Sequence, residues 1–210
     1  MNKKQKYIEE ILNSVSHGIA AIASIIGLIA LIIKSSKEEL MLFSTIVYGV
    51  SLIILYSSST LYHAFRHEKI KHIFRIIDHC SIFILIAGTY TPVVLISIGN
   101  STGWWIFGIQ WTLVLMGVIF KLFYTGKYES ISILIYIIMG WMVVFKWDDL
   151  INVISNSAFN LLLAGGIIYT IGILFYLFDS KIKYFHFVWH LFVMTGSILH
   201  YIMIFKYVIN

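Results

Sequence analysis

Residues 14–33 read SVSHGIAAIASIIGLIALII, a run of 20 residues in which His17 is the only ionisable side chain. A helix needs about 20 apolar residues to cross a bilayer. The run is closed by the polar segment KSSKEE at positions 34–39. We therefore predict a transmembrane helix over this stretch.

Six further apolar runs follow, each ended by charged or turn residues. With the first run, the predicted spans are 14–33, 40–65, 73–98, 104–124, 130–147, 159–178 and 184–205. They are too long for barrel strands and do not alternate strictly, and a helix pairs every backbone polar group internally. Pro92, the only proline, falls in the third run, where it can kink the helix. The sequence predicts an all-α membrane protein, a single seven-transmembrane helix bundle over residues 1–210.

The composition excludes a water-soluble globule. Of the 210 residues, 60% are hydrophobic and 12% are charged, and the mean hydropathy is +0.89. An ordinary soluble domain carries roughly 25% charged residues. The net charge of +5 lies in the segments between the apolar runs, so membrane topology explains it better than nucleic-acid binding. The single cysteine, Cys80, excludes a disulfide framework and a four-cysteine metal site.

The basic residues are distributed unequally between the two sides of the predicted bundle. One side, which includes the N-terminus, collects eleven of the fifteen: Lys3, Lys4, Lys6, Arg66, Lys69, Lys71, Arg75, Lys121, Lys127, Lys181 and Lys183. The other side has Lys34, Lys37, Lys146 and Lys206. The positive-inside rule then predicts a cytoplasmic N-terminus and, with seven spans, an external C-terminus.

Ionisable residues inside the apolar runs are few, and in lipid such residues are costly and usually functional. His63 falls near the end of the second span, Asp78 near the start of the third, and His186 and His190 near the start of the seventh. Given the alternating direction of the spans, these four residues fall at a similar depth, toward the cytoplasmic face.

The pair His186 and His190 predicts a metal site. Residues four apart lie on one face of a helix, so both imidazoles can reach one ion. The pair alone is also compatible with two core histidines that hydrogen-bond to neighbouring helices. With His63 as the third ligand, the set matches a zinc site that leaves one position open for water.

Two further residues are predicted to serve this site. Asp78 would hydrogen-bond to or deprotonate the water, although an ion pair with Arg75, one helical turn earlier, is an alternative. Ser59, one turn before His63, could hold the histidine ring or a substrate carbonyl. For a serine in a membrane helix, a hydrogen bond to its own helix backbone is the more common role.

The other candidates are weaker. His79 and Cys80 point away from Asp78 on a helix, and core packing is the favoured role for Cys80. His200 is about 15 Å along the helix axis from His190 and cannot share its metal. His17 has the right depth on the first span and stays a candidate for supporting the site, whereas His67 and His72 fall in a loop.

The three motifs together resemble the hemolysin III family, which is related to the progestin and adiponectin receptors and more distantly to alkaline ceramidases. The residues that carry the resemblance are Ser59-Thr-Leu-Tyr-His63, Asp78-His-Cys-Ser81 with Ala87-Gly-Thr-Tyr-Thr-Pro92, and His186-Phe-Val-Trp-His190. The segment Glu9-Glu-Ile-Leu-Asn-Ser-Val-Ser-His-Gly18 also resembles the family's entry into its first helix. The likeness covers nearly the whole chain, and no motif position departs from it.

The resemblance implies a seven-helix bundle with zinc toward the cytoplasmic side. By motif position, His63, His186 and His190 would be its ligands, Asp78 would bind the zinc-held water, and Ser59 would be the companion serine. We expect a zinc-dependent hydrolase in the plasma membrane that cleaves an amide or ester bond of a membrane lipid.

Two alternatives stay open. A receptor or sensor could use zinc structurally, because three histidines also hold helices together. A haemolysin could perturb membranes directly, but a released pore former needs a soluble state that this chain lacks. An ion transporter is less favoured, because Asp78 is the only carboxylate placed well within a span.

Overall fold

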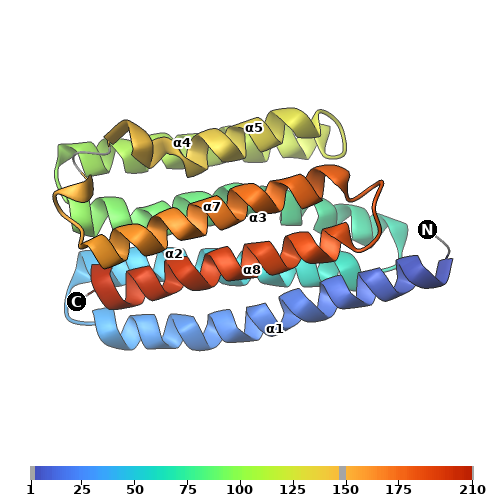
Figure 1. Cartoon of the computed structure of the whole chain (residues 1–210), viewed down its shortest axis with the longest axis horizontal. Helices are drawn as coiled ribbons and strands as arrows, with labels where there is room; N and C mark the ends of the chain where they lie inside the picture. Colours follow the sequence, from blue (N-terminus) through green and yellow to red (C-terminus); the bar gives the residue numbers. More distant parts are fainter. Residues whose placement is uncertain (1–2, 147–149, 210) are drawn as a thin grey trace.

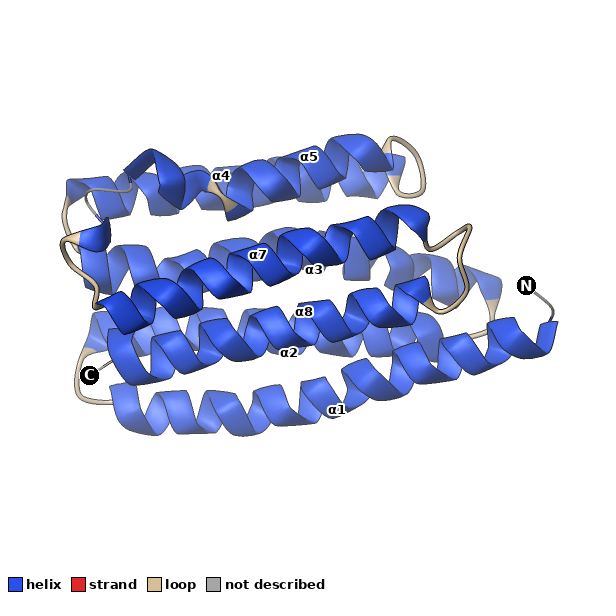
Figure 2. Cartoon of the chain, viewed as in Figure 1, coloured by secondary structure: helices blue, strands red, loops and turns tan. Residues whose placement is uncertain are grey.

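The computed structural model describes residues 3–146 and 150–209, and helices account for nearly all of them (Figure 2). The helices are α1 (Lys3–Ser35), α2 (Glu39–Ala64), α3 (Glu68–Pro92), α4 (Ser101–Tyr124), α5 (Glu129–Gly140), α7 (Asn156–Phe178) and α8 (Phe185–Met203). Three short segments extend them: the π-helices η1 (Val93–Ile98) and η3 (Ile204–Val208) and the 3₁₀-helix η2 (Met142–Lys146).

The helices run side by side along the long axis of the molecule (Figure 1). Helix α1 packs against α2 and α8, α7 packs against α8, and α3 contacts α2, α4 and α5. Within the described ranges, seven helices are long and apolar enough to cross a membrane. The prediction of an all-α fold with seven long apolar helices is confirmed.

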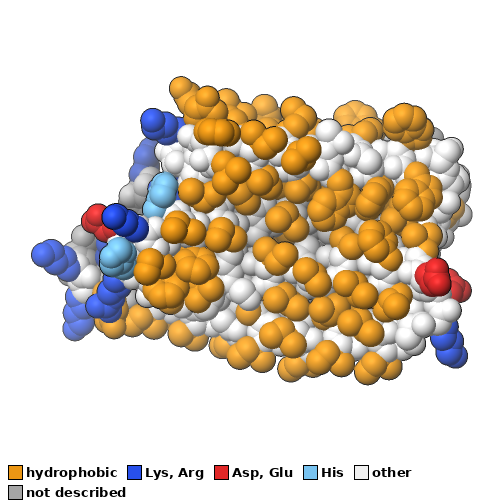
Figure 3. Space-filling view, turned by 180° about the vertical axis from the view of Figure 1, so that it is seen from behind, with side chains coloured by type: hydrophobic (Ala, Val, Ile, Leu, Met, Phe, Trp, Pro, Cys, Tyr) orange, Lys and Arg blue, Asp and Glu red, His pale blue; other side chains and the backbone are white. Residues whose placement is uncertain are grey.

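The outer surface of the bundle is apolar between two polar ends. Large hydrophobic side chains such as Ile19, Ile26, Trp105 and Phe123 are exposed along the helices. Figure 3 shows hydrophobic side chains covering the flank, while Lys and Arg gather mainly at one end of the molecule. This distribution is the one expected of a protein embedded in a bilayer.

Several helix boundaries differ from the predicted spans. Helix α3 begins at Glu68 rather than at residue 73, so His72, which was expected in a loop, is helical. Helix α1 begins at Lys3 rather than at Ser14, because Lys, Gln and Glu are good helix formers and the helix continues beyond the apolar run. The fifth predicted span, 130–147, starts one residue later than α5, which ends at Gly140 and gives way to the 3₁₀ segment. Position 147 lies outside the described residues.

Helix α3 is the most buried of the seven helices. Two of its residues, Gly88 and Pro92, determine its packing and its end. After Pro92, which has no N–H to donate, the hydrogen-bond pattern changes to that of the π-helix η1, which ends at Gly99 in the left-handed conformation. Gly88 lets α3 approach α2 closely: a Cβ atom there would lie 2.7 Å from the Ser51 Cβ and 2.3 Å from its Oγ. The absence of a side chain at position 88 therefore sets the spacing of these two helices.

This packing predicts opposite effects for two glycine-to-alanine substitutions. Gly88→Ala should destabilise the protein by about 1–3 kcal/mol, because the added methyl group overpacks the contact with Ser51. Gly108→Ala is the matched control: nothing lies within 4 Å of its Cβ position, so alanine should be neutral or stabilising by about 0.5–1 kcal/mol. Thermal unfolding in detergent micelles measures both effects, and equal melting temperatures for the two variants would contradict the prediction.

Candidate metal centre

Three histidines from two helices converge near one end of the bundle. His63 lies in the last turn of α2, and His186 and His190 lie on α8. One ligand atom from each of the three lies within 4.8 Å of the others. His63 and His190 are buried and His186 is half-buried. Among the described residues, this is the group of histidine, cysteine and acidic side chains that could hold a metal ion.

The backbone conformation before α8 places His186 next to Asp179. Tyr184 adopts a left-handed conformation with φ of 62° directly before α8 begins. His186 therefore lies in the first turn of α8, and its Nδ1 is 2.7 Å from Oδ2 of Asp179, which follows α7. The carboxylate fixes the orientation of the ring, as outer carboxylates commonly do for metal-binding histidines.

A second carboxylate holds His63 in the same way. Oε2 of Glu10, on α1, lies 2.8 Å from Nδ1 of His63. Lys71 donates to both oxygens of Glu10 at 3.0 Å, which holds the carboxylate in place. With Nδ1 engaged, Nε2 of His63 is left to face the other histidines, and it is buried without a partner among the described residues.

The donor set fits a metal ion. Nδ1 of His190 is buried and has no partner in the described part of the chain. Buried polar atoms are nearly always paired. Unpaired nitrogens on two of the three converging imidazoles could therefore bind a metal ion, and neutral imidazole nitrogens suit zinc and other borderline metals.

Asp78 and Ser59 lie beside the histidines. The Ser59 side chain hydrogen-bonds to that of Asp78. Both residues line the same internal cavity as His186 and His190. The structure thus brings together all five residues singled out from the sequence, from α2, α3 and α8.

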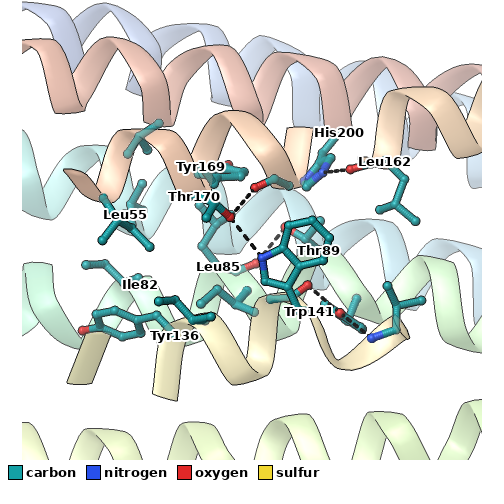
Figure 4. Close-up of a pocket in the computed structure, with 18 of the residues that line it drawn as sticks. Leu55, Ile82, Leu85, Thr89, Tyr136, Trp141, Leu162, Tyr169, Thr170 and His200 are labelled. Atoms are coloured by element: carbon teal, nitrogen blue, oxygen red, sulfur yellow. Dashed lines mark hydrogen bonds between the residues drawn. The ribbon is translucent and has the colours of Figure 1, made fainter. Parts of the chain in front are cut away.

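The cavity has a volume of about 170 Å³ and extends from the histidines into the apolar interior. Figure 4 shows Leu55, Ile82 and Leu85 among its walls, and two polar contacts lie further along it. Trp141 Nε1 donates to Thr170 Oγ1 at 3.0 Å, and His200 Nε2 lies 3.1 Å from the Leu162 carbonyl oxygen. His200 therefore lines the cavity without belonging to the three-histidine group.

His79 and Cys80 do not join the histidine cluster. His79 is buried with its Nδ1 3.6 Å from Oε1 of Glu129, and Cys80 is a buried free thiol. Glu129 also accepts a 2.5 Å hydrogen bond from Lys121, whose side chain is fully buried. Lys121 thus lies in the bundle interior with its charge paired, so it contributes less to the cationic end of the molecule than the sequence count assigns to it.

Sequence reasoning missed Glu10 and Asp179. Asp179 falls between the predicted spans 159–178 and 184–205, and Glu10 precedes the apolar run that defines the first span. A periodicity signal was available, since Glu10, Asn13 and His17 are spaced i, i+3 and i+7 and share one face of a helix. Glu9 and Glu10 lie near the start of α1 and Glu129 is the first residue of α5, so these carboxylates lie outside the predicted spans 14–33 and 130–147.

Comparison with known proteins identifies the family. A family model described as "Haemolysin-III related" matches residues 5–201. The chain belongs to the haemolysin-III-related family. Hemolysin-3 of Bacillus cereus is 44% identical over 203 residues, which cover 96% of this chain and 92% of that protein.

Two other family relatives extend the comparison. The Hemolysin-3 homolog of Bacillus subtilis (strain 168) is 40% identical over 191 residues, covering 90% of this chain and 89% of the relative. The human monocyte to macrophage differentiation factor is 28% identical over 208 residues, covering 95% and 84% respectively. The haemolysin-III-related chain is thus similar over nearly its full length to both bacterial and animal proteins.

The orienting role of Glu10 gives a testable prediction. Glu10→Gln should lower the affinity of the purified protein for added Zn²⁺ by about 10- to 100-fold, because the His63 ring loses the charged partner that fixes it. Competition with a zinc-binding dye measures the affinity. Glu39→Gln, which removes an exposed carboxylate from the start of α2, is the control and should bind as the wild type does. Equal affinities for the two variants would refute the role assigned to Glu10.

Proposed function

We propose that this protein is a zinc-dependent hydrolase that cleaves an amide or ester bond of a membrane lipid. The observation that carries the proposal is the meeting of three parts: the converging histidines, the hydrogen-bonded pair of Asp78 and Ser59, and an apolar cavity that all but His63 line. Metal ligands, an acid–base group and space for an apolar chain are the parts that such a reaction needs.

His63, His186 and His190 would hold the zinc ion. When bound, zinc would polarise a carbonyl oxygen and make a water molecule more acidic. Glu10 and Asp179 keep two of the three rings in their binding orientation.

Asp78 would act as the acid–base group. Its carboxylate takes a proton from the attacking water as the new bond to the carbonyl carbon forms. When the bond to the leaving nitrogen or oxygen breaks, Asp78 returns the proton to that atom. Ser59 holds the carboxylate through their hydrogen bond, so its position does not depend on solvent.

The cavity would hold the acyl chain of the substrate. Leucine and isoleucine side chains form much of its wall, so an acyl chain that enters from the bilayer passes from one apolar environment to another. A lipid can reach such a cavity from the surrounding bilayer, which suits a site placed between transmembrane helices.

This hydrolase proposal predicts lipid turnover that depends on Asp78. Zinc-loaded protein incubated with a panel of lipid amides and esters should release fatty acid, detected by mass spectrometry. Asp78→Asn should slow the release by about 10²- to 10⁴-fold, because the amide cannot accept the proton, while the zinc content stays at the wild-type level. Wild-type protein that binds zinc but cleaves no lipid faster than Asp78→Asn would refute the hydrolase and favour a receptor with structural zinc.

We also propose that residues 1–210 form one seven-helix unit in the plasma membrane, with the N-terminus in the cytoplasm. The cationic end of the bundle supports this orientation. In a Cys80→Ser background, Lys37→Cys at the opposite end should react with a membrane-impermeant maleimide on intact cells. Lys127→Cys, between α4 and α5, should react only after the cells are permeabilised, and the reverse pattern would invert the topology.

A further inference from the structure

His17 lies next to the metal centre but has no assigned role. It is on α1, is only 3% exposed, and lines the same cavity as Ser59, Asp78, His186 and His190. Neither of its ring nitrogens makes a hydrogen bond of good geometry among the described residues, and both are buried. A buried side chain with two unpaired polar atoms is costly unless something in the cavity pairs with it.

The orientation of the His17 ring does not suit a fourth metal ligand. The ring stacks on that of His190 with centroids 3.6 Å apart and planes 10° from parallel. Imidazole nitrogens bind in the plane of their own ring, so the two histidines direct their bonds along two parallel layers rather than toward one point. In agreement, His17 is not part of the converging group of His63, His186 and His190.

The surroundings hold the His17 ring rigidly. On another side, Tyr56 meets it edge-on, with centroids 4.9 Å apart. The Tyr56 hydroxyl donates to Ser197 at 2.7 Å, and Ser197 also pairs with Tyr169 at 2.6 Å. Contacts from α2, α7 and α8 thus fix the position of the His17 ring, although its two nitrogens are unpaired.

We propose that His17 binds the reacting group of the substrate, donating a hydrogen bond to its carbonyl oxygen from the layer beside the metal ligands. This assignment rests on the proposed hydrolase. A neutral imidazole has one donor and one acceptor nitrogen. The donor nitrogen of His17 pairs with the carbonyl oxygen on which negative charge develops, where a rigidly held donor is most effective. The acceptor nitrogen pairs with an N–H or O–H group next to the substrate's carbonyl group.

Two substitutions separate hydrogen bonding from stacking. His17→Phe keeps an aromatic ring against His190 but removes both nitrogens, whereas His17→Gln keeps a donor and an acceptor but removes the ring. The probe is acetohydroxamate, a small chelator that carries a carbonyl group and has no acyl chain to occupy the rest of the cavity. Metal content is measured by mass spectrometry, and probe affinity is measured from the visible spectrum of the Co²⁺-loaded protein.

We expect both variants to keep the wild-type metal content. His17→Phe should bind the probe about 10- to 100-fold more weakly, the loss expected for a hydrogen bond to a charged group, and His17→Gln should recover most of the affinity. Wild-type affinity in His17→Phe would overturn the proposal, as would loss of metal from that variant to the level of His190→Ala. Failure of the metal-loaded wild type to bind the probe would overturn it equally.

These results are distinguishable from failure of the hydrolase itself. Probe binding that depends on His17, in a protein that cleaves no lipid, would refute hydrolysis and keep His17 as a ligand-binding residue. Lipid cleavage with unchanged probe affinity in His17→Phe would refute the role of His17 alone.

Discussion

The bilayer supplies no hydrogen-bond partners, so each polar group inside this bundle has to be paired by the protein or by something the protein binds. Most of the interior obeys this constraint through contacts between helices. The fully buried Lys121 side chain donates a 2.5 Å hydrogen bond from its ammonium group to Oε2 of Glu129. Tyr56, Ser197 and Tyr169 form a chain of hydroxyl groups that joins α2, α8 and α7.

The same constraint explains how the candidate metal centre is built. Glu10 would be costly near the apolar region if it were alone, but His63 and Lys71 share its charge. Asp179 lies in the α7–α8 connection, where it meets the first turn of α8. Both carboxylates thus occupy helix or loop positions close to the polar end of the bundle, and each reaches inward to orient one histidine.

The sequence predicts the helices and the identity of the clustered residues better than it predicts their partners. Hydropathy fixes the spans, and the alternating direction of the spans places His63, Asp78, His186 and His190 at one depth without knowledge of which helices touch. Glu10 escapes this reasoning because hydropathy marks where α1 enters the apolar region rather than where the helix begins. Lys121 escapes it because a charge near the end of a span looks the same from the sequence whether it faces water or Glu129.

The cavity and the buried polar atoms without hydrogen-bond partners are visible only in three dimensions. The unpaired atoms support a binding site because several of them lie together. Among the described residues, single unpaired atoms also occur at Asn13, Tyr48, Arg75, Gln110, Ser132 and His200. At His17, His63 and His190, four unpaired nitrogens belong to rings that contact each other. A random lapse in pairing would scatter such atoms along the helices, whereas selection for ligand binding concentrates them at one place, beside a cavity that can admit the ligand.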